Sequence, residues 1–270
     1  MACARKVKAV LIARGHRKIQ MIRSKRTAKM PLGLVASVAV VGLVAVSACG
    51  PAPVNTGIND RYEAQNRATH QFNLSVDRYI LRPVATRADN LVPDKVEEGI
   101  GNFADNLELP GAVVNSLLQF RLEKALENTL RFAINSTIGI GGVFDPATAA
   151  GVIGKQTDFG ETLHVWGVRE GNYFELPLLG PSTDRDALGK VVDFALDPLK
   201  LVFPDRNNTP LLAQIASRIS DRGRYSETVD SVLYDSADSY AQARLLYLQN
   251  RRFELGEVVS EENFEDPYAQ

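Results

Sequence analysis

The sequence contains very little cysteine and histidine. Its 270 residues include two cysteines, Cys3 and Cys49, three histidines and one tryptophan. Once a leader that ends before Cys49 is removed, Cys49 is the only cysteine left, which excludes an internal disulfide and a zinc site built on paired cysteines. The apolar run Leu32–Val46 is shorter than the roughly 20 residues that a transmembrane helix needs.

Acidic residues are absent from the start of the chain. Residues 1–30 contain ten lysines or arginines and neither aspartate nor glutamate, and the apolar run follows them. A basic segment, a short apolar segment and small residues before a cleavage point are typical of a secretory signal peptide. The sequence therefore predicts a signal peptide at residues 1–48, with Met21 as an alternative start.

The predicted cleavage point resembles a bacterial lipobox. Val46–Cys49 places an aliphatic residue and two small residues before cysteine, so lipidation of Cys49 is expected; the alternative is an ordinary signal peptide with a coincidental cysteine. Several acyl chains hold a protein at a membrane, because each buried methylene contributes about 0.8 kcal/mol. Lipoproteins that are retained at the inner membrane commonly have aspartate directly after the lipidated cysteine, whereas this sequence has Gly50. We therefore expect the chain to be anchored in the periplasmic leaflet of the outer membrane. Residues 49–58 would form the lipidated tether.

The predicted mature chain has a strong excess of acid. Residues 49–270 carry 21 basic and 32 acidic side chains, a formal charge of −11, although the whole chain is close to neutral. This charge argues against nucleic acid as a partner and against docking on anionic headgroups through basic patches.

Apolar residues at helical spacing predict a mainly α fold in a single domain, residues 59–255, followed by an acidic tail, residues 256–270. Asp60 and Glu63 have the spacing of a capping box, and Pro83 is expected to end the helix that they open. The other expected helices cover 112–134, 184–196 and 226–253.

Two segments depart from helical spacing. Val165–Val168 and Tyr173–Leu176 predict a small β-hairpin. Ile134–Gly154 carries one charge and five glycines, and Asp145-Pro146 at its middle argues against a continuous transmembrane helix. This segment is either a buried loop or a re-entrant element at membrane depth.

An enzyme is the weaker alternative. Ser182, His164 and Asp184 could be written as a triad, but Ser182 lacks the Gly-x-Ser-x-Gly setting of an exposed nucleophile. The acid pair Asp158 and Glu161 is better explained as a solvated face. We predict no catalytic activity, no cofactor and no metal site.

Four blocks of sequence resemble the MlaA (VacJ) family of lipoproteins. They are Asn59-Asp60 with Glu63, Asn66-Arg67, Phe72-Asn73 and Arg82–Ala85; Asn102-Phe103 with Asn106–Glu108, Pro110 and Asn115–Gln119; Arg131-Phe132 with Asn135–Asp145; and Asp158–Leu163 with Trp166–Val168, Gly171, Tyr173, Leu176–Thr183 and Arg185-Asp186.

The resemblance implies a fold and a function. The expected fold is a ring of amphipathic helices in the periplasmic leaflet of the outer membrane. The expected function is removal of mislocalised phospholipids from the outer leaflet through an amphipathic channel, which maintains lipid asymmetry. The implied partners are phospholipids, a trimeric porin and a periplasmic lipid-carrier protein. The alternative is a structural lipoprotein that scaffolds an envelope complex without lipid passage.

Eight residues of these blocks are the candidate site. Gly139, Gly141, Gly142 and Asp145 are expected to shape or gate the lipid path, and Asn66, Arg67, Phe72 and Asn73 to hold the resting arrangement. Each also has a purely structural interpretation: the glycines in turns, Phe72 in the core or facing lipid, and Asn66 as a helix cap or cross-link.

Overall fold

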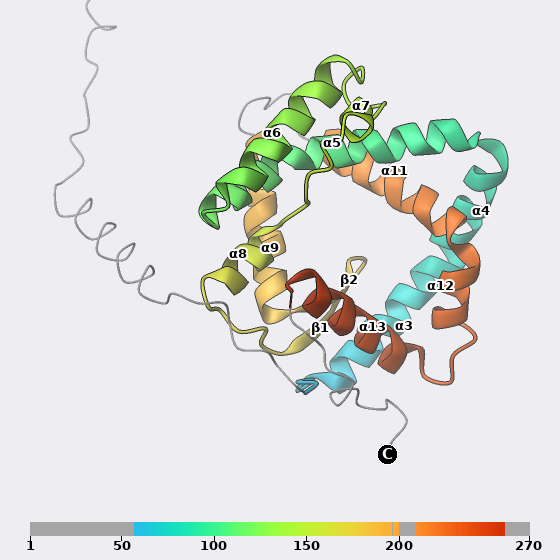
Figure 1. The fold of residues 1–270 in the computed structure, drawn as a ribbon. Helices are drawn as coiled ribbons and strands as arrows, with labels where there is room; N and C mark the ends of the chain where they lie inside the picture. The colour runs from blue at the N-terminus through green and yellow to red at the C-terminus, as the bar shows by residue number, and fades with distance from the viewer. Residues whose placement is uncertain (1–56, 196, 200–208, 257–270) are drawn as a thin grey trace, which may run out of the picture. The chain divides into compact units, whose positions relative to one another are not determined.

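A computed structural model describes residues 57–195, 197–199 and 209–256. Helices predominate in these ranges, which confirms the mainly α prediction (Figure 1). The elements are α3 (Glu63–Val76), the π-helix η2 (Asp77–Leu81), α4 (Arg82–Leu91), α5 (Asp94–Leu118), α6 (Leu122–Thr137), α7 (Pro146–Ala149), α8 (Phe159–Val165), β1 (Tyr173–Leu176), β2 (Gly180–Thr183), α9 (Asp184–Ala195), α11 (Thr209–Arg224), α12 (Ser226–Leu233) and α13 (Ser239–Glu254). The predicted signal peptide, Cys49 and residues 257–270 lie outside the described residues.

The first helical stretch continues past the expected stop. α3, η2 and α4 follow one another without a loop, and Pro83 lies in the first turn of α4, where proline is tolerated. The predicted capping box is also wrong. Tyr62 is the N-cap residue and makes no side-chain cap bond, while Asp60 binds side chains from elsewhere in the fold.

The helix expected at 112–134 is two helices. α5 begins at Asp94 and runs through Pro110 to Leu118, and α6 begins at Leu122. Between them, Phe120 adopts a left-handed backbone conformation (φ 58°), which turns the chain back so that α6 packs along α5. Helical spacing of apolar residues continues across this turn, and the sequence pattern therefore did not reveal it.

The C-terminal helical region is also divided. α12 and α13 replace the single helix expected at 226–253, and Asp238 caps α13 by accepting a hydrogen bond from the Ala241 backbone N–H (3.0 Å). α11 was not predicted. The helix expected at 184–196 is confirmed as α9 over its described residues.

The β-hairpin exists but with a different partner strand. Tyr173 pairs with Thr183 and Leu176 with Gly180 in an antiparallel register. The stretch 165–168, expected as the other strand, instead ends α8 and turns at Gly167. Gly180 and Pro181 are poor strand formers, so β2 depends on its tertiary setting and gave no propensity signal.

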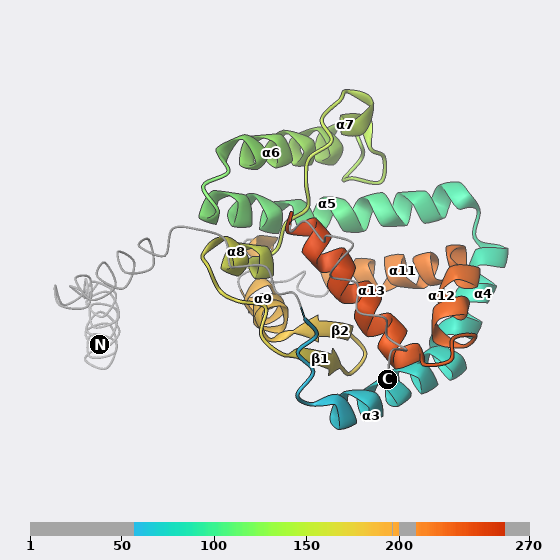
Figure 2. The same ribbon diagram turned by 60° about the horizontal axis from the view of Figure 1, so that its bottom comes forward.

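Packing contacts between the elements form a closed circuit. α3 contacts β1, β2 contacts α9, α9 packs on α8, and α8 contacts α5; α5 then packs on α11, and α11 on α4, which continues back through η2 to α3. α13 crosses β2 and joins α12 (Figure 2). Every element of this circuit touches two neighbours.

The buried side chains are mainly polar. Most of the fully buried apolar residues are alanines, and the main apolar cluster comprises Tyr173, Tyr240 and Leu248. By contrast, rows of large apolar side chains are exposed, such as Leu122, Leu126 and Leu130 along one face of α6; others include Ile138, Ile140, Phe144, Ile153, Leu188, Val191 and Phe194. A water-soluble domain normally has the opposite distribution, so these exposed faces indicate an apolar environment.

Candidate functional site

Two asparagines of α3 bind the free edge of strand β1. Asn66 donates from Nδ2 to the Tyr173 carbonyl (3.1 Å) and accepts from the Glu175 backbone N–H (3.1 Å). Asn73, two turns further on, donates to the Leu176 carbonyl (3.0 Å) and accepts from the Leu178 N–H (2.8 Å). The side-chain amides therefore take the place of a third strand, which fixes the position of α3 along the sheet.

Asp60 connects this junction to α13. It accepts hydrogen bonds from Asn66 Nδ2 (2.8 Å), from the Tyr240 hydroxyl and from Arg244 Nη1 (2.5 Å). Burial, followed by the neighbouring Asp60 carboxylate, raises the pKa of Tyr240, which therefore remains a hydrogen-bond donor. A buried carboxylate with these partners is satisfied, and the network holds helices from opposite ends of the chain together.

A second carboxylate, Glu175, completes the buried cluster. It accepts from the Tyr173 hydroxyl (2.6 Å) and Asn73 Nδ2 (3.1 Å), and its Oε1 lies 3.4 Å from His70 Nδ1. Burial and the adjacent Glu175 charge raise the pKa of Tyr173. With Asn66, α3 and β1 together supply five side chains of this cluster, namely Asn66, His70, Asn73, Tyr173 and Glu175.

Arg67 lies at the border of this cluster, whereas Phe72 lies outside it. Arg67 pairs in a bidentate manner with Asp238 (3.0 and 2.8 Å), the carboxylate that also caps α13. Its guanidinium lies over the Tyr240 ring, 4.6 Å from the centroid. Phe72 takes no part in this cluster; its side chain is 50% exposed. Of the two earlier interpretations of Phe72, burial in the core is wrong.

We expect Asn66→Ala to lower the free energy of unfolding by about 2 kcal/mol, because two buried backbone groups of β1 lose their partners. Urea unfolding followed by circular dichroism measures the change. Gln65→Ala, at an exposed neighbouring position of α3, is the control and should be nearly neutral. Equal effects of the two substitutions would mean that the amide does not secure the strand edge.

The glycine-rich block follows α6 and has an unusual backbone. Ile140, Gly141 and Gly142 have positive φ in succession (55°, 74° and 99°). A Cβ at Gly139 would lie 2.3 Å from the Phe144 carbonyl oxygen, and one at Gly142 would lie 2.4 Å from Asn106 Cβ, whereas Gly141 has open space. Glycine is thus required at Gly139 and Gly142 by close packing, and at Gly141 only by conformation.

Asp145 holds the second half of this block. It caps α7 by accepting from the Thr148 N–H (3.1 Å), and it binds Arg131 Nη2 (2.6 Å) and Asn135 Nδ2 (3.0 Å). Burial raises the pKa of Asp145, but the hydrogen bonds from Thr148 and Asn135 and the charge of Arg131 outweigh it and keep the pKa low. Asp145 is therefore a charged anchor for the loop.

Seven of the eight candidate residues form two separate groups, and Phe72 belongs to neither. Asn66, Arg67 and Asn73 belong to the α3–β1–α13 junction, whereas the glycines and Asp145 belong to the loop between α6 and α7. In the described part of the chain, no hydrogen bond or ion pair links one group to the other. The two groups can therefore act on different parts of the molecule.

With this geometry known, comparison with other proteins identifies the family. The MlaA lipoprotein family matches residues 58–254, which is more than half of the chain. The chain belongs to the MlaA lipoprotein family.

The match to individual MlaA proteins covers most of both chains. The intermembrane phospholipid transport system lipoprotein MlaA of Haemophilus influenzae is 34% identical over 215 residues, 77% of this chain and 85% of that protein. The protein of the same name from Escherichia coli K12 is 34% identical over 223 residues, 79% of this chain and 85% of that protein. The chain is also similar to a solved structure described as the "Structural basis for maintenance of bacterial outer membrane lipid asymmetry". The TM-score is 0.62 and the sequence identity 32%, and the match covers 73% of this chain and 98% of that chain.

Membership of the MlaA family confirms three sequence-based predictions. The chain is a lipoprotein of the outer membrane, and because the family is not enzymatic the chain is not an enzyme. The residues of the suggested triad have other partners: Asp184 accepts from Asn172 Nδ2 (2.8 Å), Ser182 Oγ lies 3.3 Å from Lys190 Nζ, and His164 Nδ1 lies 3.3 Å from Arg185. None of the described helices combines the length and the apolar character that a membrane span requires.

The sequence patterns assigned no functional role to several charged residues. Asp105 and Glu108 lie three residues apart on α5, a spacing that places both on one face and could have been noticed. The buried pair Asp77 and Arg222, by contrast, joins η2 to α11 across 145 positions (2.8 Å) and carries no local signal. Only the tertiary structure brings such pairs together.

Proposed function

We propose that this protein removes mislocalised phospholipids from the outer leaflet of the outer membrane and passes them toward the periplasm, which maintains lipid asymmetry. The observation that carries the proposal is the combination of exposed apolar helix faces with polar buried side chains, in a chain that is similar to intermembrane phospholipid transport lipoproteins. Nothing in this function requires covalent chemistry.

Physical chemistry explains why this distribution suits the task. A phospholipid headgroup that crosses hydrocarbon loses its water, and the loss of hydrogen bonds costs several kcal/mol for each polar group. Polar side chains along a path would lower that cost, while apolar outer faces would match the acyl chains of the surrounding leaflet. The closed circuit of packing contacts supports a ring of helices around such an amphipathic channel.

The two groups of candidate residues have different roles in this proposal. Gly139, Gly141, Gly142 and Asp145 shape or gate the path, supported by the close packing of Gly142 on Asn106. Asn66, Arg67 and Asn73 hold α3 against β1 and α13 in the resting arrangement, and Phe72 presents an apolar surface beside them. Lipidation of Cys49 holds the domain in the periplasmic leaflet.

We further propose two kinds of protein partner. A trimeric porin would position the domain in the outer membrane, and a periplasmic lipid carrier would receive the phospholipid. The exposed apolar rows of α6 and α9 provide surface for lipid or for a membrane protein. The choice of porin and the direction of net transport depend on these partners.

The test is the amount of outer-leaflet phospholipid in a deletion strain that carries wild type, Cys49→Ala or no copy of the protein. We expect surface phospholipid to rise on deletion and to return to normal only with wild type, because an unlipidated chain leaves the membrane. Surface labelling followed by lipid extraction measures it. Unchanged asymmetry in the deletion strain would instead favour a scaffolding lipoprotein without lipid passage.

A further inference from the structure

Charged side chains of α5, α9 and α11 gather beside one another. Gln214 of α11 donates to Glu108 of α5 (3.0 Å), and Asn115 of α5 donates to Asp193 of α9 (2.9 Å). These bonds place Glu108 of α5 beside α11 and Asp193 of α9 beside α5. Asp105, one turn before Glu108, accepts from Gln156 Nε2 (3.3 Å).

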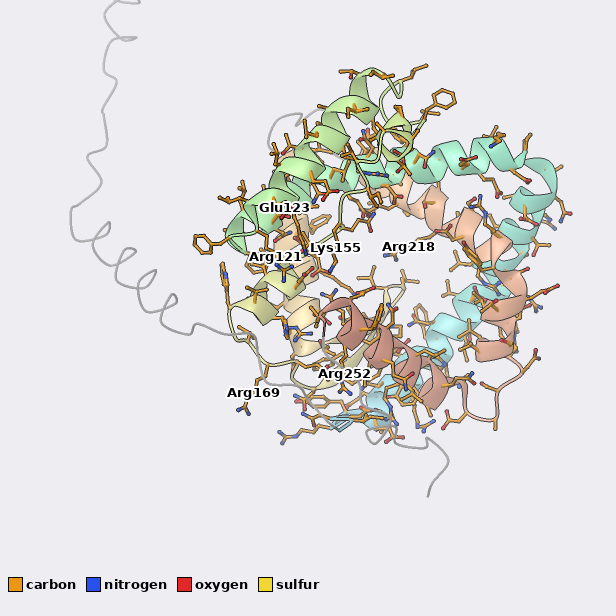
Figure 3. All side chains as sticks on the ribbon, viewed as in Figure 1. Arg121, Glu123, Lys155, Arg169, Arg218 and Arg252 are labelled. Atoms are coloured by element: carbon orange, nitrogen blue, oxygen red, sulfur yellow. The ribbon has the colours of Figure 1, made fainter. Side chains whose placement is uncertain are left out.

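Arg218 is the cation beside these carboxylates. It lies one turn after Gln214 on α11 and therefore on the same face as the residue that binds Glu108. Figure 3 shows Arg218 extending from α11 toward the middle of the helical domain, whereas Arg169 extends away from it. Across the described residues, no hydrogen bond or ion pair involves the Arg218 guanidinium, which leaves its donors available to a ligand.

The surroundings of these groups combine access to water with enclosure by protein. Asp105, Glu108 and Arg218 are solvent-exposed. Even so, burial raises the pKa of both Asp105 and Glu108 above the ordinary range, and for Glu108 the charge of Asp105 adds to this effect while Arg218 opposes it. A side chain is both exposed and raised in pKa where water reaches it but protein surrounds it on several sides. That setting suits a polar ligand.

We propose that Arg218, with Asp105 and Glu108, forms a subsite for a zwitterionic phospholipid headgroup, in which Arg218 binds the phosphate and the carboxylates bind the ammonium. This inference rests on the proposed lipid passage. Arginine binds phosphate through parallel N–H donors, and an ammonium group offers N–H donors to carboxylates. Because Arg218 makes no ion pair with the acids next to it, its guanidinium can bind the phosphate, and the second oxygen of each carboxylate, which Gln214 and Gln156 do not bind, can accept from the ammonium.

The balance of charge predicts selectivity. Arg131 and Arg251, which act on these carboxylates, pair with Asp145 and Asp158. Asp105, Glu108 and Asp193 therefore outnumber Arg218 and the nearby Lys190, and an anionic headgroup without an ammonium would meet repulsion from them. A zwitterionic headgroup satisfies both the cation and the carboxylates. In a site open to water the difference between the two lipids is modest, roughly threefold.

The experiment measures which phospholipid the purified protein takes up. Full-length lipidated protein in detergent is incubated with vesicles of equal phosphatidylethanolamine and phosphatidylglycerol, reisolated, and its lipid measured by mass spectrometry. We expect roughly threefold enrichment of phosphatidylethanolamine with wild type. Asp105→Asn combined with Glu108→Gln should abolish the enrichment, and Arg218→Gln should lower the uptake of both lipids.

Matched controls are available on exposed surfaces. Glu123→Gln and Arg169→Gln remove the same charges from exposed positions outside this cluster and should behave as wild type (Figure 3). Uptake in the input ratio by wild type, or an unchanged ratio in the double variant, would overturn the subsite and leave lipid passage intact. Failure of wild type to take up either lipid would overturn the proposed function as well.

Discussion

Gly142→Ala is expected to raise outer-leaflet phospholipid nearly to the level of a strain that lacks the protein. The new Cβ would lie 2.4 Å from Asn106 Cβ, at a φ of 99° that alanine rarely adopts. Asn106 would have to move, and its hydrogen bonds to Ser136 Oγ and the Gly141 carbonyl (both 3.1 Å) would be lost. The strain alone costs about 1–3 kcal/mol. The loop after α6 would therefore leave its resting position.

Gly141→Ala is the matched control for this substitution. It adds the same methyl group at a similar φ of 74°, but nothing lies within 4 Å of the added atom. Surface phospholipid should rise less than with Gly142→Ala, because the two variants share the backbone strain and only Gly142→Ala displaces Asn106; both variants should be at normal levels on an immunoblot of outer-membrane fractions. Normal lipid asymmetry with correctly localised Gly142→Ala protein would refute a role for this packing contact in the lipid path.

Arg222→Met is expected to lower the free energy of unfolding by about 3–5 kcal/mol, because it leaves a buried carboxylate without its cation. Arg222 binds both oxygens of Asp77 (2.8 and 2.9 Å) and also Asp230 (2.6 Å). Both side chains of the pair with Asp77 are 9% exposed. The pair joins η2 to α11, so its loss weakens the packing of α11 on α4. Urea unfolding of the purified protein measures the effect.

A control at an exposed ion pair separates burial from charge. Lys95→Met removes the same charge at a side chain that is 89% exposed and pairs with the 56%-exposed Glu98 (2.9 Å), and it should leave the free energy of unfolding nearly unchanged. Asp77→Leu combined with Arg222→Met should cost less than the sum of the single substitutions, since no charge then remains unpaired. A loss of less than about 1 kcal/mol in Arg222→Met would show that Tyr234, which donates to Asp77 (2.7 Å), satisfies the carboxylate by itself.

The sequence predicted helices more successfully than their ends. α9 was placed correctly because Asp184 and the apolar spacing after it are local features. The division of α5 from α6 at Phe120 and of α12 from α13 before Asp238 was missed, because amphipathic spacing continues across both turns. Asp60 illustrates the same limit: its spacing to Glu63 suggested a cap, but its actual partners are Tyr240 and Arg244, 180 and 184 positions away.

The sequence by itself determined the acidic character of residues 49–270, the mainly helical class and, through blocks such as Asn135–Asp145, the family, and it predicts the secretion and lipidation signals. These properties follow from composition, short motifs and local spacing. Only the tertiary structure decided which polar side chains are buried together, that Asn66 and Asn73 bind a strand edge, that Gly142 packs on Asn106, and that Arg218 lies beside the carboxylates of α5 without pairing to them. Each of these contacts joins residues far apart in the chain, and long-range packing, unlike helical periodicity, leaves no repeating pattern in the sequence.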